Sequence, residues 1–110
     1  MNVGMTTTAE LRDAIYSGRK GEALFQSHVM GLLRARGWQS YHAWSAIHSR
    51  AGFPDLVAWR DERLLFAELK APRGRLSAEQ AAVIEGLRAT GAEVYVWYPR
   101  DWDEIEGVLR

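Results

Sequence analysis

Two carboxylates and a lysine in the middle of the chain are the residues best suited to chemistry. Asp55 follows a proline, and Glu68 and Lys70 belong to a Glu-Leu-Lys tripeptide that begins after twelve intervening residues. Carboxylate oxygens are hard ligands of the kind that Mg²⁺ and Mn²⁺ prefer. A metal bound there acidifies water and neutralises charge on a scissile phosphate, while Lys70 can orient that water or stabilise the transition state. Together the three side chains predict a metal-dependent phosphodiesterase centre.

The segments that carry these residues decide whether they meet. Residues 55–60 and 64–70 are rich in strand formers and flank a short polar stretch, which predicts a β-hairpin. An even-length turn pairs residues whose numbers sum to 123, so Asp55 faces Glu68 with Cβ atoms about 4.5–5.5 Å apart. Two carboxylates so placed repel each other unless a cation lies between them. Lys70 is expected on the face of Glu68; the other interpretation is a solvated hairpin in which Lys70 neutralises one carboxylate.

Two further polar residues lie in predicted helices. Gln80 shares the apolar face of a helix that starts after Ser77 and ends near Gly91, and a glutamine on a buried face needs hydrogen-bond partners. Ser77 and Gln80 also form a capping-box sequence, so Gln80 can serve the helix end, the site or both. Glu22 and Gln26 are four residues apart on one helix face, and Glu22 could simply complement the helix dipole.

The remaining segments supply the rest of one domain. Their patterns predict helices over residues 8–16, 20–36 and 102–110 and strands over residues 38–46 and 93–98. Thr8 and Asp101 are the expected caps of the first and last helices. The order α-α-β-β-β-α-β-α predicts an α/β fold, with a mixed central sheet flanked by helices, over residues 8–110. Residues 1–7 are expected to be a flexible N-terminus.

The composition of the chain restricts the class of protein to which it can belong. A chain of 110 residues with 47% hydrophobic and 25% charged residues fits one globular domain. No apolar run approaches the roughly 20 residues of a membrane span, and the first nine residues lack the pattern of a signal peptide. Cysteine is absent, which excludes disulfides and thiolate sites and fits a cytoplasmic setting, such as a bacterial or phage-infected cell. The formal net charge is zero, but residues 1–75 carry +4 and residues 76–110 carry −4.

The sequence resembles the PD-(D/E)XK nuclease superfamily and, within it, the virus-type replication-repair nuclease domain, VRR-NUC. The resemblance covers nearly all of the chain after the first twenty residues. It rests on five stretches: Glu22-Ala-Leu-Phe-Gln26, Leu33-Arg-Ala-Arg-Gly-Trp38, Gly52-Phe-Pro-Asp-Leu56, Phe66-Ala-Glu-Leu-Lys70 and Gly74-Arg-Leu-Ser-Ala-Glu-Gln80. Gly-x-Pro-Asp-Leu together with Glu-Leu-Lys and a trailing glutamine is a specific combination of motifs.

The resemblance implies an active site, an activity and an assembly. The implied catalytic set is Glu22, Asp55, Glu68, Lys70 and Gln80. The implied ligands of Mg²⁺ or Mn²⁺ are the carboxylates of Glu22, Asp55 and Glu68 and the backbone carbonyl of Leu69. The implied activity is a structure-selective DNA endonuclease, and small stand-alone members resemble dimers that cut branched DNA, including four-way (Holliday) junctions. The alternatives are a nuclease for flaps or for a defined sequence, and a non-catalytic nucleic-acid-binding or subunit-interaction module.

Several residues outside this set could contact DNA. His48, Arg50, Arg73 and Arg75 flank the site in sequence and could follow the phosphate backbone, although solvated loop residues are an equal alternative. His28 and His42 have no assigned role.

A homodimer is also expected, because symmetric cutting of a branched substrate needs two sites related by a two-fold axis. Trp97, Tyr98 and Trp102 cluster near the C-terminus and are residue types that interface cores favour. The sequence therefore places the interface at the last strand and helix.

Overall fold

The computed structural model describes residues 7–42 and 51–110 of the chain. The elements, in chain order, are α1 (Thr8–Ile15), α2 (Gly21–Ala35), β1 (Gln39–His42), β2 (Leu56–Arg60), β3 (Arg63–Leu69), α3 (Ala78–Ala89), β4 (Glu93–Trp97), the 3-10 turn η1 (Pro99–Asp101) and α4 (Trp102–Leu109). Apart from the added turn η1, this is the predicted order, and the α/β fold is confirmed. The predicted strand over residues 38–46 runs in its later part into residues 43–50, which lie outside the described residues.

The four strands form one mixed sheet in the order β1-β2-β3-β4. β2 is antiparallel to both β1 and β3, whereas β3 and β4 are parallel. Arg60 pairs with Arg63, and Leu56 pairs with Ala67, so the predicted register of the hairpin is confirmed. Asp61 begins the two-residue turn with φ 55°, a conformation that aspartate tolerates better than most residues.

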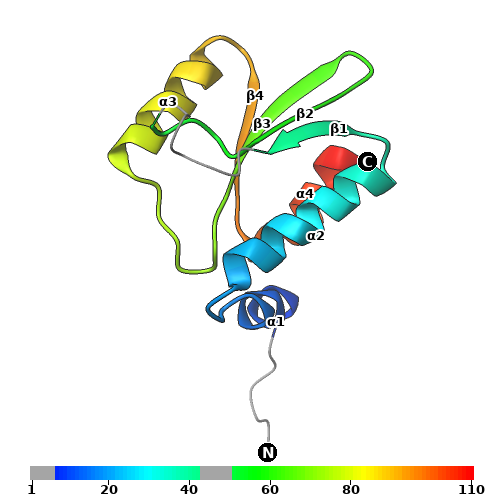
Figure 1. The fold of residues 1–110 in the computed structure, drawn as a ribbon, viewed down its shortest axis with the longest axis vertical. Helices are drawn as coiled ribbons and strands as arrows, with labels where there is room; N and C mark the ends of the chain where they lie inside the picture. The colour runs from blue at the N-terminus through cyan, green and yellow to red at the C-terminus, as the bar shows by residue number, and fades with distance from the viewer. Residues whose placement is uncertain (1–6, 43–50) are drawn as a thin grey trace, which may run out of the picture.

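Helices cover both faces of the sheet, with α3 on one side and α2 and α4 on the other (Figure 1). The main core lies on the side of α2 and α4. Its largest fully buried side chains are Trp97, Phe25, Leu33, Leu56, Leu65, Leu69, Ile105 and Leu109. Because residues of opposite parity in a strand point to opposite faces, Leu65 and Leu69 of β3 face this core and Glu68 faces the side of α3.

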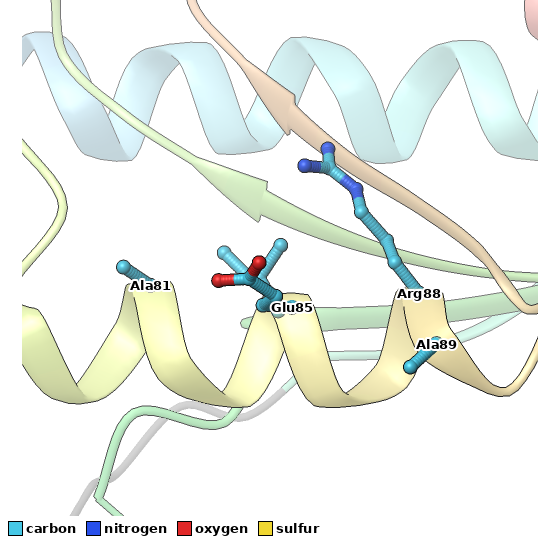
Figure 2. A pocket seen from close by; sticks show the side chains of 5 residues that line it. Ala81, Glu85, Arg88 and Ala89 are labelled. Carbon is cyan, nitrogen blue, oxygen red and sulfur yellow. The ribbon is translucent and has the colours of Figure 1, made fainter.

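On the other face of the sheet, α3 packs against β4 through fewer buried side chains than the main core has. Ile84 of α3 and Val94 of β4 are both buried. Arg88 reaches from α3 towards β4 and donates two hydrogen bonds to the Val94 carbonyl, at 3.1 and 2.9 Å (Figure 2). Ala81 and Glu85 line the shallow hollow beside Arg88.

The predicted cap of α1 is wrong by one residue, whereas Asp101 holds the predicted N-cap position of α4 without a side-chain capping hydrogen bond. Thr7 rather than Thr8 caps α1, and its hydroxyl accepts a hydrogen bond from the Glu10 N–H at 3.0 Å. The Asp101 side chain does not cap α4. It accepts from the Tyr98 N–H at 2.9 Å, because η1 is inserted between β4 and α4.

The predicted interface aromatics belong largely to the core of the chain itself. Trp97 is fully buried in the main core, and Trp102 packs against that core as a partly buried residue. The expected interface at the last strand and helix is therefore wrong as far as Trp97 is concerned. Among the described helices, none is both long and apolar enough to cross a membrane.

Candidate active site

Four of the five predicted catalytic residues meet at one end of the β2–β3 hairpin. Asp55 immediately precedes β2, Glu68 lies in β3, Lys70 follows β3, and Gln80 is the third residue of α3. Lys70 Nζ donates to Gln80 Oε1 at 2.9 Å and lies 3.3 Å from Glu68 Oε2. Gln80 Nε2 donates to the same Glu68 Oε2 at 2.9 Å. The three side chains thus form a closed triangle of polar contacts.

Asp55 joins this group through two hydrogen bonds that cross between the chain segments. The Asp55 N–H donates to Glu68 Oε1 at 3.2 Å, and the Leu69 N–H donates to Asp55 Oδ2 at 3.1 Å. Each carboxylate is therefore fixed by the backbone of the opposite segment. The predicted juxtaposition of Asp55 and Glu68 is confirmed, while a shared cation stays a prediction.

Gln80 has both of the roles that the sequence left open. The Ser77 hydroxyl accepts from the Gln80 N–H at 3.0 Å, and Gln80 Oε1 accepts from the Ser77 N–H at 2.9 Å, which completes a capping box. The same Oε1 accepts from Lys70. The start of α3 and the position of the lysine are therefore linked through one amide group.

Gly52 explains how the segment before Asp55 comes so close to α3. Its φ is +86°, and a Cβ at this position would lie 2.6 Å from the Glu79 carbonyl oxygen in the first turn of α3. Both the backbone conformation and the close approach therefore favour glycine. The glycine of the Gly-Phe-Pro-Asp stretch thus positions Asp55 beside the helix that carries Gln80.

Burial dominates the electrostatics of Glu68. The residue is 2% exposed, and its pKa is raised from 4.5 to about 7, first by burial and then by the nearby charge of Asp55. Lys70 acts in the opposite direction and lowers the pKa. A divalent cation held by hard carboxylate oxygens would relieve both the burial cost and the repulsion. The donor set therefore fits Mg²⁺ or Mn²⁺.

Glu22 is not gathered into this group. It is an exposed residue of the first turn of α2, whose buried side packs on the sheet face opposite to that of Glu68. Within residues 7–42 and 51–110, no group of three or more His, Asp or Glu residues is placed to hold a metal ion. The structure thus assembles two of the three predicted carboxylate ligands, and the role of the Leu69 carbonyl stays a prediction.

The structure describes four of the six other residues that the sequence analysis named. His48 and Arg50 lie outside the described residues. Arg73 and Arg75 are exposed between Lys70 and α3. His28 is hydrogen-bonded through Nδ1 to the Tyr16 hydroxyl, and His42 is buried at the end of β1.

The sequence did not predict which residue holds the loop that follows Lys70. The Tyr98 hydroxyl donates to the Gly74 carbonyl at 2.9 Å, so this side chain holds the loop in place. The two residues are 24 positions apart, and no local pattern in the sequence signals their contact.

The mixed sheet and the Asp-Glu-Lys group define a PD-(D/E)XK fold. The structure is similar to that of Hjc from Archaeoglobus fulgidus, a Holliday junction resolvase from an archaeal hyperthermophile, with a TM-score of 0.53 and 26% sequence identity. The similarity covers 69% of this chain and 66% of that chain. A sequence profile of the VRR-NUC domain matches residues 3–101. The chain belongs to the VRR-NUC domain family.

One curated relative is similar over a shorter stretch. Fanconi-associated nuclease 1 from Danio rerio is 41% identical over 51 residues, which are 44% of this chain and 5% of that protein. The chain thus spans a small part of this relative and just under two thirds of the archaeal resolvase.

Proposed function

We propose that this chain is a structure-selective DNA endonuclease that hydrolyses phosphodiester bonds with Mg²⁺ or Mn²⁺, with branched DNA such as four-way junctions as its substrate. The observation that carries the proposal is the contact network of Asp55, Glu68, Lys70 and Gln80. The names of the two relatives, a resolvase and a nuclease, agree with it.

Each residue of the network has a role in this proposal. Asp55 and Glu68 would hold the metal, which supplies an acidified water and charge neutralisation when bound. Gln80 holds Lys70 in place at 2.9 Å, so that the ammonium group points into the site before substrate arrives. A cation positioned in advance can stabilise the negative charge that develops on the phosphate without reorganisation. Gln80 is thus a positioning residue for Lys70.

Lys70→Ala tests the role of the lysine. Cleavage should fall by about 10²–10³-fold, as for loss of a single transition-state contact. DNA binding should persist, because one charge contributes little among many phosphate contacts. Arg34→Ala is the matched control, since it removes an exposed cation from the far end of α2. Cleavage by Lys70→Ala at the wild-type rate would make the lysine structural and contradict the mechanism.

The substrate is tested with single-stranded, duplex, flap, splayed-arm and four-way DNAs, each with Mg²⁺, Mn²⁺ or EDTA. The proposal expects metal-dependent cleavage of the four-way junction in preference to the duplex. Preference for the flap would favour the first alternative. Binding without cleavage under every condition would identify a non-catalytic module.

We further propose that two chains act as a homodimer through an apolar sheet surface. The surface consists of Tyr41, Trp59 and Leu64, which are 66%, 43% and 50% exposed. The strand pairing places all three on the sheet face of Glu68. An exposed apolar surface on the same sheet face as the candidate site suits a second copy of the chain, because closed two-fold dimers are the commonest assemblies.

Light scattering at micromolar concentration tests the dimer. The wild type should have twice the chain mass of 12.5 kDa. Trp59→Lys with Leu64→Lys should give a monomer. Leu11→Lys, at a 53% exposed position on α1, is the control and should remain dimeric. A wild-type monomer that still cuts both strands of a four-way junction in a coordinated way would refute the proposal.

A further inference from the structure

The cations of the described chain fall into two groups. Most are engaged by carboxylates or backbone carbonyls, namely Arg12, Arg36, Arg60, Arg63, Lys70, Arg88 and Arg100. The others are exposed and, within the described residues, form no ion pair, namely Arg19, Lys20, Arg34, Arg73, Arg75 and Arg110. Cations left without an acidic partner are available to bind an anionic ligand.

Four of these free cations come from two segments that face each other. A hollow is lined on one side by Tyr16, Ser17 and Gly18 and on the other by Ala71, Pro72 and Arg73. Arg19 and Lys20 directly follow the first side, Arg73 belongs to the second, and Arg75 lies two residues beyond it in the chain. The second side begins at Ala71, immediately after Lys70, so the hollow adjoins the candidate active site. Arg34 and Arg110 lie instead at the opposite end of α2, where the chain ends (Figure 1).

The turn between α1 and α2 is held in place by close packing. A Cβ on Gly21 would lie 1.7 Å from the Tyr16 carbonyl oxygen, so the two helices meet as closely as a glycine allows. The buried Tyr16 ring packs edge-on against Phe25, with centroids 5.5 Å apart. Arg19 and Lys20 therefore project from a fixed turn.

The loop after Lys70 is held by residues at the end of the sheet. The Tyr98 hydroxyl donates to the Gly74 carbonyl at 2.9 Å, and Arg100 donates to the Pro72 carbonyl at 3.3 Å. Arg100 also lies 3.7 Å from Asp13 of α1, so one side chain connects α1 with this loop. The two sides of the hollow thus keep their relative position.

We propose that Arg19, Lys20, Arg73 and Arg75 form one surface that binds the phosphate backbone of DNA leading into the active site. Arginine and lysine bind phosphate oxygens, and contacts to phosphates position a duplex without reading its sequence. The sequence suggested His48 and the loop arginines, and the structure adds the turn that precedes α2. This inference rests on the proposed function, because it takes DNA as the ligand.

The salt dependence of DNA binding tests the surface. Each phosphate contact contributes about −0.9 to the slope of log K against log salt concentration. The double variant Arg19→Gln, Lys20→Gln should make the slope shallower by about 1.8, equally for unrelated DNA sequences. The matched control is Arg34→Gln, Arg110→Gln, which removes the same charge from exposed residues at the other end of α2 and should leave the slope unchanged. Binding is measured in EDTA, so that no strand is cut.

A second variant tests the other side of the hollow independently of Arg19 and Lys20. Arg73→Gln alone removes a cation from the other side of the hollow. It should make the slope shallower by about 0.9. Thermal unfolding shows whether each variant is folded. If the slope is unchanged in the Arg19 and Lys20 variant, or falls equally in the control, the surface is wrong even though wild-type cleavage would still support the proposed function. If the wild type neither binds nor cuts any DNA, both proposals are overturned.

Discussion

The raised pKa of Glu68 predicts an unusual dependence of stability on pH. A carboxyl group whose pKa is 4.5 when unfolded and about 7 when folded binds more protons in the native state between these values. The free energy of unfolding should therefore fall as pH rises. The stabilisation is fully present below pH 4.5 and is lost as pH rises through about 7. Glu68→Gln should remove this contribution, because its amide does not titrate.

The size of the effect follows from the two pKa values. They differ by about 2.5, and each pKa unit corresponds to about 1.4 kcal/mol, so the full loss is about 3–4 kcal/mol. Integrated between pH 5 and pH 8, the loss is about 2–3 kcal/mol. Glu68 is only 2% exposed, so solvent screening reduces this value little. An effect of that size is a large fraction of the stability of a small domain.

Urea denaturation in EDTA at pH 5, 6, 7 and 8 measures the effect. Subtracting the variant from the wild type cancels the titrating groups that do not interact with Glu68, so the difference reports Glu68 together with its neighbours Asp55 and Lys70. Any hydrogen bond lost in Glu68→Gln adds a difference in the free energy of unfolding that does not change with pH. Glu62→Gln is the matched control, because Glu62 is an exposed residue of the hairpin turn. A difference between wild type and Glu68→Gln that does not change with pH would refute the reasoning.

Urea denaturation also tests whether Asp55 and Glu68 bind a metal ion. At pH 8, added Mg²⁺ should stabilise the wild type by mass action, because it binds only the folded site. Glu68→Gln should gain much less, since one of the two carboxylates is missing. Equal stabilisation of both proteins would place the metal elsewhere.

The hairpin and the start of α3 could be predicted because their determinants are local. The two-residue turn at Asp61 fixes the pairing of Arg60 with Arg63 and, through alternation along the strands, the position of Asp55 opposite Glu68. The capping box likewise depends only on residues three positions apart. Most of the candidate site therefore follows from short-range patterns.

The burial of Trp97 in the chain's own core could not be predicted in the same way. Val94 and Trp97 are three residues apart, so they point to opposite faces, yet both are buried. The strand is enclosed by α3 on one side and by the main core on the other. When both faces are covered, alternation no longer distinguishes inside from outside. Trp97 was therefore wrongly expected to be available to a partner chain.

The position of Glu22 also depends on long-range packing. Its place in the first turn of α2 is local and was predicted, but its distance from Asp55 depends on how α2 lies against the sheet. The apolar stripe of Phe25 and Val29 fixes that contact on the face opposite to Glu68. A helical pattern gives the buried side of a helix but not which sheet face it covers.

Two further predictions concern the packing that supports the site. Gly31→Ala should raise the free energy of unfolding by about 0.5–1 kcal/mol, because Gly31 lies inside α2 and no atom would lie within 4 Å of its Cβ. Gly21→Ala on the same helix should lower it, because its Cβ would meet the Tyr16 carbonyl oxygen. Urea denaturation compares the two, and a stable Gly21→Ala would contradict the close approach of α1 and α2. Arg60→Ala should lower the free energy of unfolding by about 1.5–3 kcal/mol. Its guanidinium donates to three backbone carbonyls at the ends of α2 and α4, at 2.9, 3.2 and 2.8 Å, and these acceptors would lose a charged donor. Arg34→Ala is the control for removal of an arginine, and equal stability of the two variants would show that water replaces the guanidinium without cost.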